Sequence, residues 1–131
     1  MDEDGVNFTL LKPLIYISPS DGSTKTIPIG FKSDGCSTPK IIWTLIPPSG
    51  IYLRGAILHD WYYRETWLPR EYCDEKFLEA MVSLGVGYVL RDTIYENLRL
   101  WGGFAFEKDR KALAEREAAE RSYKVVDATM P

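Results

Sequence analysis

The first third of the chain alternates short apolar runs with clusters of turn-forming residues. Two runs rich in β-branched residues, Leu14–Ser18 and Thr24–Phe31, flank the turn cluster Pro19–Ser23, which contains an Asp-Gly pair. Apolar runs on either side of an Asp-Gly turn predict a β-hairpin. The run Val6–Leu11 predicts a further strand before it. A small antiparallel β element of two or three strands is therefore expected.

The pattern changes to helical spacing after Ser49. The segment Ile51–Arg64 is apolar or aromatic at nearly every position, which predicts a helix buried on most sides. The segment Pro69–Leu84 spaces its apolar residues as a helix does, and Gly85 ends it. The segment Val86–Trp101 predicts a third helix, which the following pair Gly102-Gly103 is expected to break.

A charged, alanine-rich segment, Glu107–Ser122, predicts a fourth and exposed helix. Its apolar stripe is narrow, so this helix is either a solvated surface element or an arm that docks on another chain. The fold class expected is α+β, with the β element packed on a bundle of three to four helices. We expect residues 1–131 to form a single domain, with its core at about 6–103 and a charged helical extension and tail at 104–131.

Composition narrows the classes of function. The formal net charge of −3 argues against a protein that coats nucleic acid, and the basic residues do not cluster with the four tryptophans. The chain lacks an apolar run of the roughly eighteen residues that a membrane span needs, and its acidic start is unlike a signal peptide. We therefore expect synthesis in a cytoplasm. Cys36 and Cys73 are expected to be free thiols, and with one histidine they do not suit a structural zinc site.

The only histidine, His59, lies in the predicted helix within the sequence Leu58-His59-Asp60-Trp61-Tyr62-Tyr63. Tyr63 is four residues further on and shares a helix face with His59, whereas Asp60 points about 100° away. An imidazole and a carboxylate on so apolar a helix need polar partners or lose stability. Such a local conflict is typical of functional sites.

One chemical interpretation makes His59 a general base that activates a water, with Asp74 on the next helix holding its tautomer. Asp60 would bind a divalent cation such as calcium that polarises the substrate. The turn Asp34-Gly35-Cys36-Ser37 would add carbonyls to that cation or amides to an oxyanion. In a second version, Ser37 or Cys36 is a nucleophile that His59 activates.

A structural interpretation uses the same residues without chemistry. His59 is then a hydrogen-bonded core residue, and Asp60 pairs with Arg64, which is four residues on. Asp74 is a carboxylate that favours the first turn of its helix. Both interpretations stay open on the residues alone.

Several segments carry a resemblance to a known family. They are listed in chain order: Asp34-Gly35-Cys36-Ser37-Thr38-Pro39, Ile41-Ile42-Trp43, Ala56–Tyr63, Arg70, Asp74, Phe77, Ala80-Met81, Tyr95, Arg99 and Gly102. Over about residues 24–103 the chain resembles the domain-of-unknown-function family 1353 of bacteriophages and prophages. That family's turn usually reads Asp-Gly-Ala-Ser, so Cys36 departs from it, and Ser37 is the better candidate for a shared functional residue. The resemblance implies synthesis in the cytoplasm of a phage host, with incorporation in the virion as an option.

A second resemblance concerns the helix with His59. The sequence His59-Asp60-x-x-Tyr63, followed by Asp74, is similar to the site of secreted phospholipase A2. There the histidine is the base, the adjacent aspartate binds calcium, the tyrosine supports the site and the later aspartate orients the histidine. The glycine-rich calcium loop and flanking cysteines of that family are absent. The resemblance therefore implies a hydrolase-like geometry without specifying lipid as the substrate.

Three functions follow as hypotheses. The first is a phage hydrolase acting on an ester, an amide or a phospholipid. The second is a non-catalytic virion or tail component, or an accessory protein, that docks on other phage proteins through its C-terminal helix. The third is a small protein that inhibits a host protein.

Overall fold

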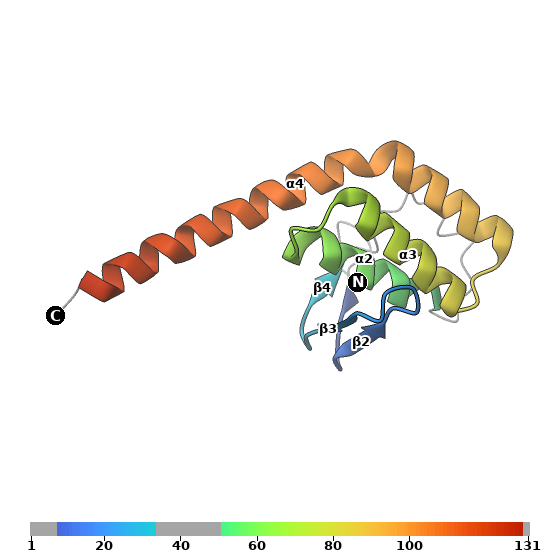
Figure 1. Ribbon diagram of the computed structural model, residues 1–131, viewed down its shortest axis with the longest axis horizontal. Helices are drawn as coiled ribbons and strands as arrows, with labels where there is room; N and C mark the ends of the chain where they lie inside the picture. The colour runs from blue at the N-terminus through green and yellow to red at the C-terminus, as the bar shows by residue number, and fades with distance from the viewer. Residues whose placement is uncertain (1–7, 34–50, 130–131) are drawn as a thin grey trace.

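The computed structural model describes residues 8–33 and 51–129 of the 131-residue chain (Figure 1). The described helices are α2 (Ile51–Glu65), α3 (Arg70–Ser83) and α4 (Tyr88–Thr129). The described strands are β1 (Phe8–Thr9), β2 (Leu14–Ile17), β3 (Thr24–Ile27) and β4 (Lys32–Ser33). The expected α+β class is confirmed, because two small antiparallel sheets accompany the helices in this part of the chain.

The β-hairpin predicted around the Asp-Gly turn is present. Strands β2 and β3 pair antiparallel, with Leu14 opposite Ile27 and Ile17 opposite Thr24. Asp21 accepts a hydrogen bond from the Ser23 backbone at 2.9 Å, and Gly22 adopts a φ of 73°, which suits glycine.

The run predicted as one strand, Thr24–Phe31, is divided in the structure. Strand β3 ends at Ile27, immediately before Pro28, because proline has no backbone N–H for a ladder. The chain then turns, and β4 pairs with β1, placing Phe8 opposite Ser33. Strand β1 occupies only part of the predicted run Val6–Leu11. With β4 added, the described β element has four short strands rather than the two or three predicted.

Helix α2 lies at the centre of the described core. Its residues Leu58, Tyr62 and Tyr63 are almost fully buried and pack with Cys73 and Ala80 of α3. Ile27 of the hairpin joins the same cluster, so the hairpin closes one side of α2. Helix α3 begins after Pro69, as predicted, and its C-cap is Leu84, after which Gly85 adopts a φ of 80°.

The predicted break at Gly102-Gly103 is wrong, because α4 is continuous from Tyr88 to Thr129. The glycines serve a close contact instead. Arg70 Nη2 donates to the carbonyl oxygens of Leu98 at 2.9 Å and Arg99 at 2.8 Å, and a Cβ on Gly102 would lie 3.3 Å from that nitrogen. The missing side chain therefore admits a guanidinium to the helix backbone, a tertiary requirement that overrides glycine's poor helix propensity.

The helix predicted over Glu107–Ser122 is present as part of α4 and is mostly exposed, but one side of it contacts the rest of the protein. Arg110 donates to the carbonyl of Leu68 at 2.6 Å, and Glu117 accepts from Trp67 at 3.0 Å. Leu113 is buried between these two contacts. This stretch of α4 is thus fastened to the connection between α2 and α3, and only the helix beyond it projects from the rest (Figure 1). Within the described residues, none of the helices combines the length and the apolar character needed to cross a bilayer.

Candidate functional site

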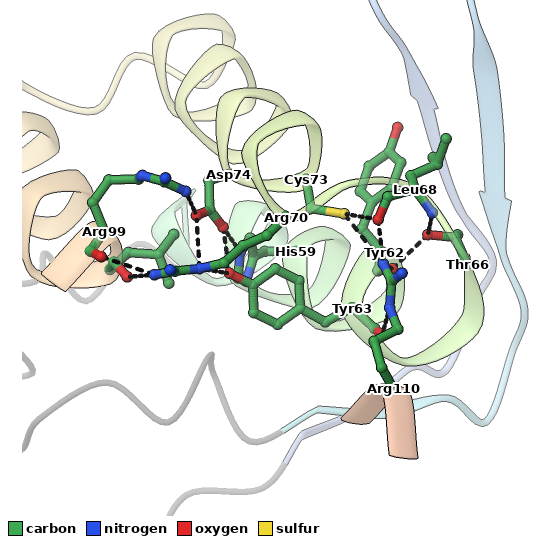
Figure 2. Close-up of polar contacts among 11 residues, drawn as sticks. His59, Tyr62, Tyr63, Thr66, Leu68, Arg70, Cys73, Asp74, Arg99 and Arg110 are labelled. Atoms are coloured by element: carbon green, nitrogen blue, oxygen red, sulfur yellow. Dashed lines mark hydrogen bonds and ion pairs between the residues drawn. The ribbon is translucent and has the colours of Figure 1, made fainter. Parts of the chain in front are cut away.

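Three helices bring polar side chains together around one buried carboxylate (Figure 2). Asp74 of α3 has no exposed surface, and its Oδ1 lies 2.7 Å from His59 Nε2 of α2. Tyr63, one helical turn after His59, donates its hydroxyl proton to the same Oδ1 at 2.5 Å. The shared helix face predicted for His59 and Tyr63 explains how both reach Asp74.

The second oxygen of Asp74 faces two guanidinium groups. Arg99 Nη1 of α4 donates a hydrogen bond to Oδ2, and Arg70 Nε lies 3.6 Å from it. Arg70 also donates to the hydroxyl of Tyr63 at 3.4 Å. Sequence reasoning gave neither arginine a role. The i,i+4 spacing of Arg70 and Asp74 was a usable signal, whereas only tertiary packing brings Arg99 here.

Burial and hydrogen bonding set the protonation states of this cluster. Burial lowers the pKa of His59, whose exposed fraction is 1%, although the hydrogen bond to Asp74 acts in the opposite direction. Burial alone would raise the pKa of Asp74, but hydrogen bonds from His59, Tyr63 and Arg99 lower it. Near pH 7 the pair is therefore a neutral imidazole and a carboxylate.

The tautomer of His59 follows from these charges. A carboxylate accepts only, so Nε2 carries the proton and Nδ1 carries the lone pair. Burial and the bond to Asp74 raise the pKa of Tyr63, which remains a phenol donor. The imidazole packs between aromatic rings, with ring centroids 4.0 Å from Tyr63 and 5.1 Å from Phe77. A neutral imidazole held in this tautomer is able to accept a proton at Nδ1.

Asp60 lies in a different environment from His59, as their adjacent helix positions predicted. Ser33 of β4 donates to Asp60 Oδ2, and Arg64 Nη2 lies 3.7 Å from the same oxygen. The pairing of Asp60 with Arg64 proposed in the structural interpretation is thus present. His59 and Asp60 each make additional interactions, so neither is limited to these partners. Among the described residues, no group of three or more His, Cys, Asp or Glu could hold a metal, and a cation at Asp60 stays a prediction.

The turn Asp34-Gly35-Cys36-Ser37 lies outside the described residues, so the roles predicted for Asp34, Gly35 and Ser37 stay predictions.

Cys73 is a free, buried thiol, as expected. Burial raises its pKa to about 11, so it is protonated near pH 7 and a poor nucleophile.

A second polar cluster joins the hairpin to α3. Lys76 is 4% exposed, and its Nζ donates to Ser18 at 2.6 Å and lies 3.1 Å from Asp21 Oδ2 and 3.5 Å from Glu79 Oε2. A serine beside a lysine is one arrangement for nucleophilic catalysis. Burial would favour the neutral amine, but the hydrogen bond to Asp21 and the charge of Glu79 raise the pKa of Lys76. An ammonium group cannot act as a base, so this cluster is an anchor.

Comparison with known proteins gives one family-level finding. A family model described as "Protein of unknown function (DUF1353)" matches residues 8–97. The matched range contains His59 and Asp74 and ends just before Arg99. Neither the curated proteins nor the solved structures contain a significant match to this chain.

Proposed function

The chain belongs to the DUF1353 family of proteins of unknown function, and we propose that this member is a hydrolase in which His59 activates a water molecule. The observation that carries the proposal is the hydrogen bond of 2.7 Å between His59 Nε2 and the buried Asp74. It fixes the tautomer that a general base needs and supplies a carboxylate to stabilise the imidazolium.

The proposed reaction proceeds in two proton transfers. Because the ring is buried, the proposed reaction requires substrate and one water to be admitted beside His59, with Nδ1 exchanging any existing contact for that water. His59 Nδ1 then removes a proton from the water while the water oxygen attacks the carbonyl carbon of the substrate. The imidazolium that forms keeps its Nε2 proton on Asp74, whose charge offsets the new positive charge. His59 then returns its Nδ1 proton to the leaving oxygen or nitrogen as the carbon–leaving-group bond breaks.

Tyr63 and the arginines have supporting roles in this proposal. The Tyr63 hydroxyl and Arg99 hold the two oxygens of Asp74, so the carboxylate cannot rotate away from His59. The same combination of histidine, tyrosine and aspartate is the basis of the similarity to secreted phospholipase A2. By that similarity Asp60 is proposed to bind a divalent cation such as calcium. The substrate class is proposed as an ester, an amide or a phospholipid, and the source as a bacteriophage or prophage.

The test uses the full-length protein and three probes: p-nitrophenyl butyrate, purified peptidoglycan and phosphatidylglycerol vesicles, each with calcium and with EDTA. His59→Gln keeps an amide donor for Asp74 but removes the base. We expect it to lower the hydrolytic rate about 10²–10⁴-fold while the circular dichroism spectrum is unchanged. Arg121→Gln, in the exposed part of α4, is the matched control and should retain the full rate.

Two results contradict the proposal. One is hydrolysis that His59→Gln leaves unchanged, and the other is failure of the wild-type protein to hydrolyse any of the three probes. The cation hypothesis is tested separately by Asp60→Asn. If Asp60 binds calcium, this variant loses the difference between the rates in calcium and in EDTA.

A second candidate function has an observation of its own. Leu100, Trp101 and Phe104 of α4 are 72%, 70% and 86% exposed, an unusual grouping of large apolar side chains. They favour the alternative of a non-catalytic phage component that docks through its C-terminal helix on another phage protein. In that case Trp101→Ser combined with Phe104→Ser prevents co-sedimentation with particles of the encoding phage, whereas His59→Gln does not. Equal co-sedimentation of both variants contradicts it.

A further inference from the structure

Among the residues that the structure describes, strand β2 has an open edge. Within the described residues β2 pairs only with β3, and the Ser18 backbone N–H donates to the Ser23 carbonyl at 2.8 Å at the end of the ladder. Hydrogen-bonded and non-hydrogen-bonded positions alternate along an antiparallel pair. Counting back from Ser18, the N–H and C=O groups of Ile15 and Ile17 point away from β3.

This edge lacks the usual protection against a further strand. Proteins commonly shield edge strands with charged residues, proline or bulges. Strand β2 has the sequence Leu-Ile-Tyr-Ile and contains none of these. The side chains of Ile15 and Ile17 are 61% and 66% exposed, so apolar surface lies next to the unpaired backbone groups.

A cleft of about 260 Å³ borders the open edge. All four residues of β2 contribute to its lining. The other lining residues come from α2, α3 and the C-cap of α3: Arg54, Leu58, Ala80, Ser83 and Leu84. Residues of β3 do not line it, so the cleft lies on the side of β2 that has no strand partner. It is mainly apolar and has room for a side chain rather than for a folded element.

Arg54 gives the cleft a charge preference. Its side chain is exposed, and within the described part of the chain it has neither an ion pair nor a side-chain hydrogen bond. By contrast, Arg70, Arg99 and Arg110 are all committed to carbonyl or carboxylate partners. An uncommitted guanidinium beside an apolar cleft favours a ligand that combines an apolar group with a carboxylate.

We propose that the open edge of β2 binds an extended, acidic segment of a partner protein by strand addition. Its backbone pairs with Ile15 and Ile17, an apolar side chain enters the cleft, and a carboxylate meets Arg54. The cleft of about 260 Å³ has room for one side chain of an extended segment that lies along this edge. The β2 strand of a second copy does not supply that carboxylate, because its sequence Leu-Ile-Tyr-Ile contains no acidic residue.

This binding site is separate from the proposed hydrolytic one. Leu58 and Arg54 face the cleft, whereas the next residue, His59, faces Asp74 on another side of α2. Variants at the cleft therefore test strand addition without touching the His59–Asp74 pair.

The experiment selects a displayed library of random octapeptides against the full-length protein. Enriched peptides should alternate apolar residues and carry Asp, Glu or a free C-terminus. Ile15→Pro removes one outward N–H and should weaken their binding about tenfold or more, and Arg54→Glu should do the same. Thr26→Pro is the matched control, because Thr26 pairs with Ile15 and its N–H points to the opposite edge of the hairpin.

The proposal is supported when the selected peptides bind the control as tightly as the wild type and both cleft variants more weakly. It is overturned if the library yields no enriched sequence. It is equally overturned if enriched peptides are basic, or bind Ile15→Pro with unchanged affinity while circular dichroism shows both proline variants folded.

Discussion

The guanidinium of Arg70 lies against Gly102, and a Cβ at that position would stand 3.3 Å from Arg70 Nη2. That nitrogen is held by the carbonyls of Leu98 and Arg99, so it cannot move without losing hydrogen bonds. This contact between Arg70 and Gly102 joins α3 to α4 about one helical turn after Arg99. Arg99 is the residue of α4 that donates to Asp74. The glycine therefore helps to position the third helix of the candidate site.

The first prediction concerns Gly102→Ala. Alanine improves helix propensity by about 1 kcal/mol, but crowding against Arg70 and Leu98 costs about 1–3 kcal/mol. We expect a net loss of about 1 kcal/mol in the free energy of unfolding, measured with urea. Gly103→Ala is the matched control, because its Cβ would meet Arg70 no closer than 3.5 Å. That variant should be neutral or slightly stabilised, and equal losses in both variants contradict the explanation.

The second prediction concerns the effect of Arg99 on His59. Asp109 and Asp74 favour the imidazolium, Arg70 opposes it, and Arg99 neutralises Asp74 by donating to Oδ2. Replacing Arg99 with glutamine leaves more of the Asp74 charge facing the imidazole, so the pKa of His59 should rise. Because the chain has one histidine, NMR titration of its ring reports this pKa without assignment ambiguity. Arg121→Gln should leave it unchanged, and a pKa that falls in Arg99→Gln contradicts the argument.

The third prediction is the dependence of stability on pH. The pKa of His59 is lower in the folded protein than its ordinary value of about 6.5. The unfolded chain therefore takes up a proton first as the pH falls through about 6.5, and the free energy of unfolding decreases by up to about 1.4 kcal/mol per pH unit. The lowered pKa of Asp74 adds a further loss below about pH 4.

Urea unfolding of the wild type and His59→Gln between pH 7 and about pH 5 checks this window. His59→Gln should show a nearly flat profile there, because it lacks the group that titrates. A wild-type protein that becomes more stable over the same interval would show that the folded state binds the proton more readily, which contradicts the lowered pKa.

The fourth prediction concerns the anchor between the hairpin and α3. Lys76→Met removes the ammonium that faces Asp21 and Glu79 and leaves the partly buried Glu79 without its cation. We expect a loss of about 3 kcal/mol in the free energy of unfolding, which is the low end of the values for breaking a buried pair, because Asp21 is partly exposed. Lys12→Met, at an exposed position, is the control and should change little. The proposed hydrolytic activity should persist in folded Lys76→Met, because Lys76 is not part of the His59–Asp74 pair.

Local signals in the sequence determined most of the secondary structure. The Asp-Gly turn specified the hairpin, and Pro69 and Gly85 delimited α3, because turn and cap conformations depend on a few adjacent residues. Helical periodicity placed His59 and Tyr63 on one face and Asp60 on another, as the structure has them. It also made Asp74 on the next helix a candidate partner for His59.

Tertiary structure decided what those signals could not. The convergence of Arg70 and Arg99 on Asp74 depends on how three helices pack, which no spacing within one segment encodes. The sequence predicted a helix end at Gly102, but α4 continues through it and Arg70 packs against it. The hydrogen bonds of Arg70 to the α4 backbone offset the poor helix propensity of glycine. Sequence by itself thus determined most of the helix and strand positions, because local signals set them, and the face of α2 that carries the imidazole. The charged groups that set the protonation of His59 belong to Arg70, Asp74 and Arg99, which are distant from it in the chain. Only the packing of three helices brings these groups together around the imidazole.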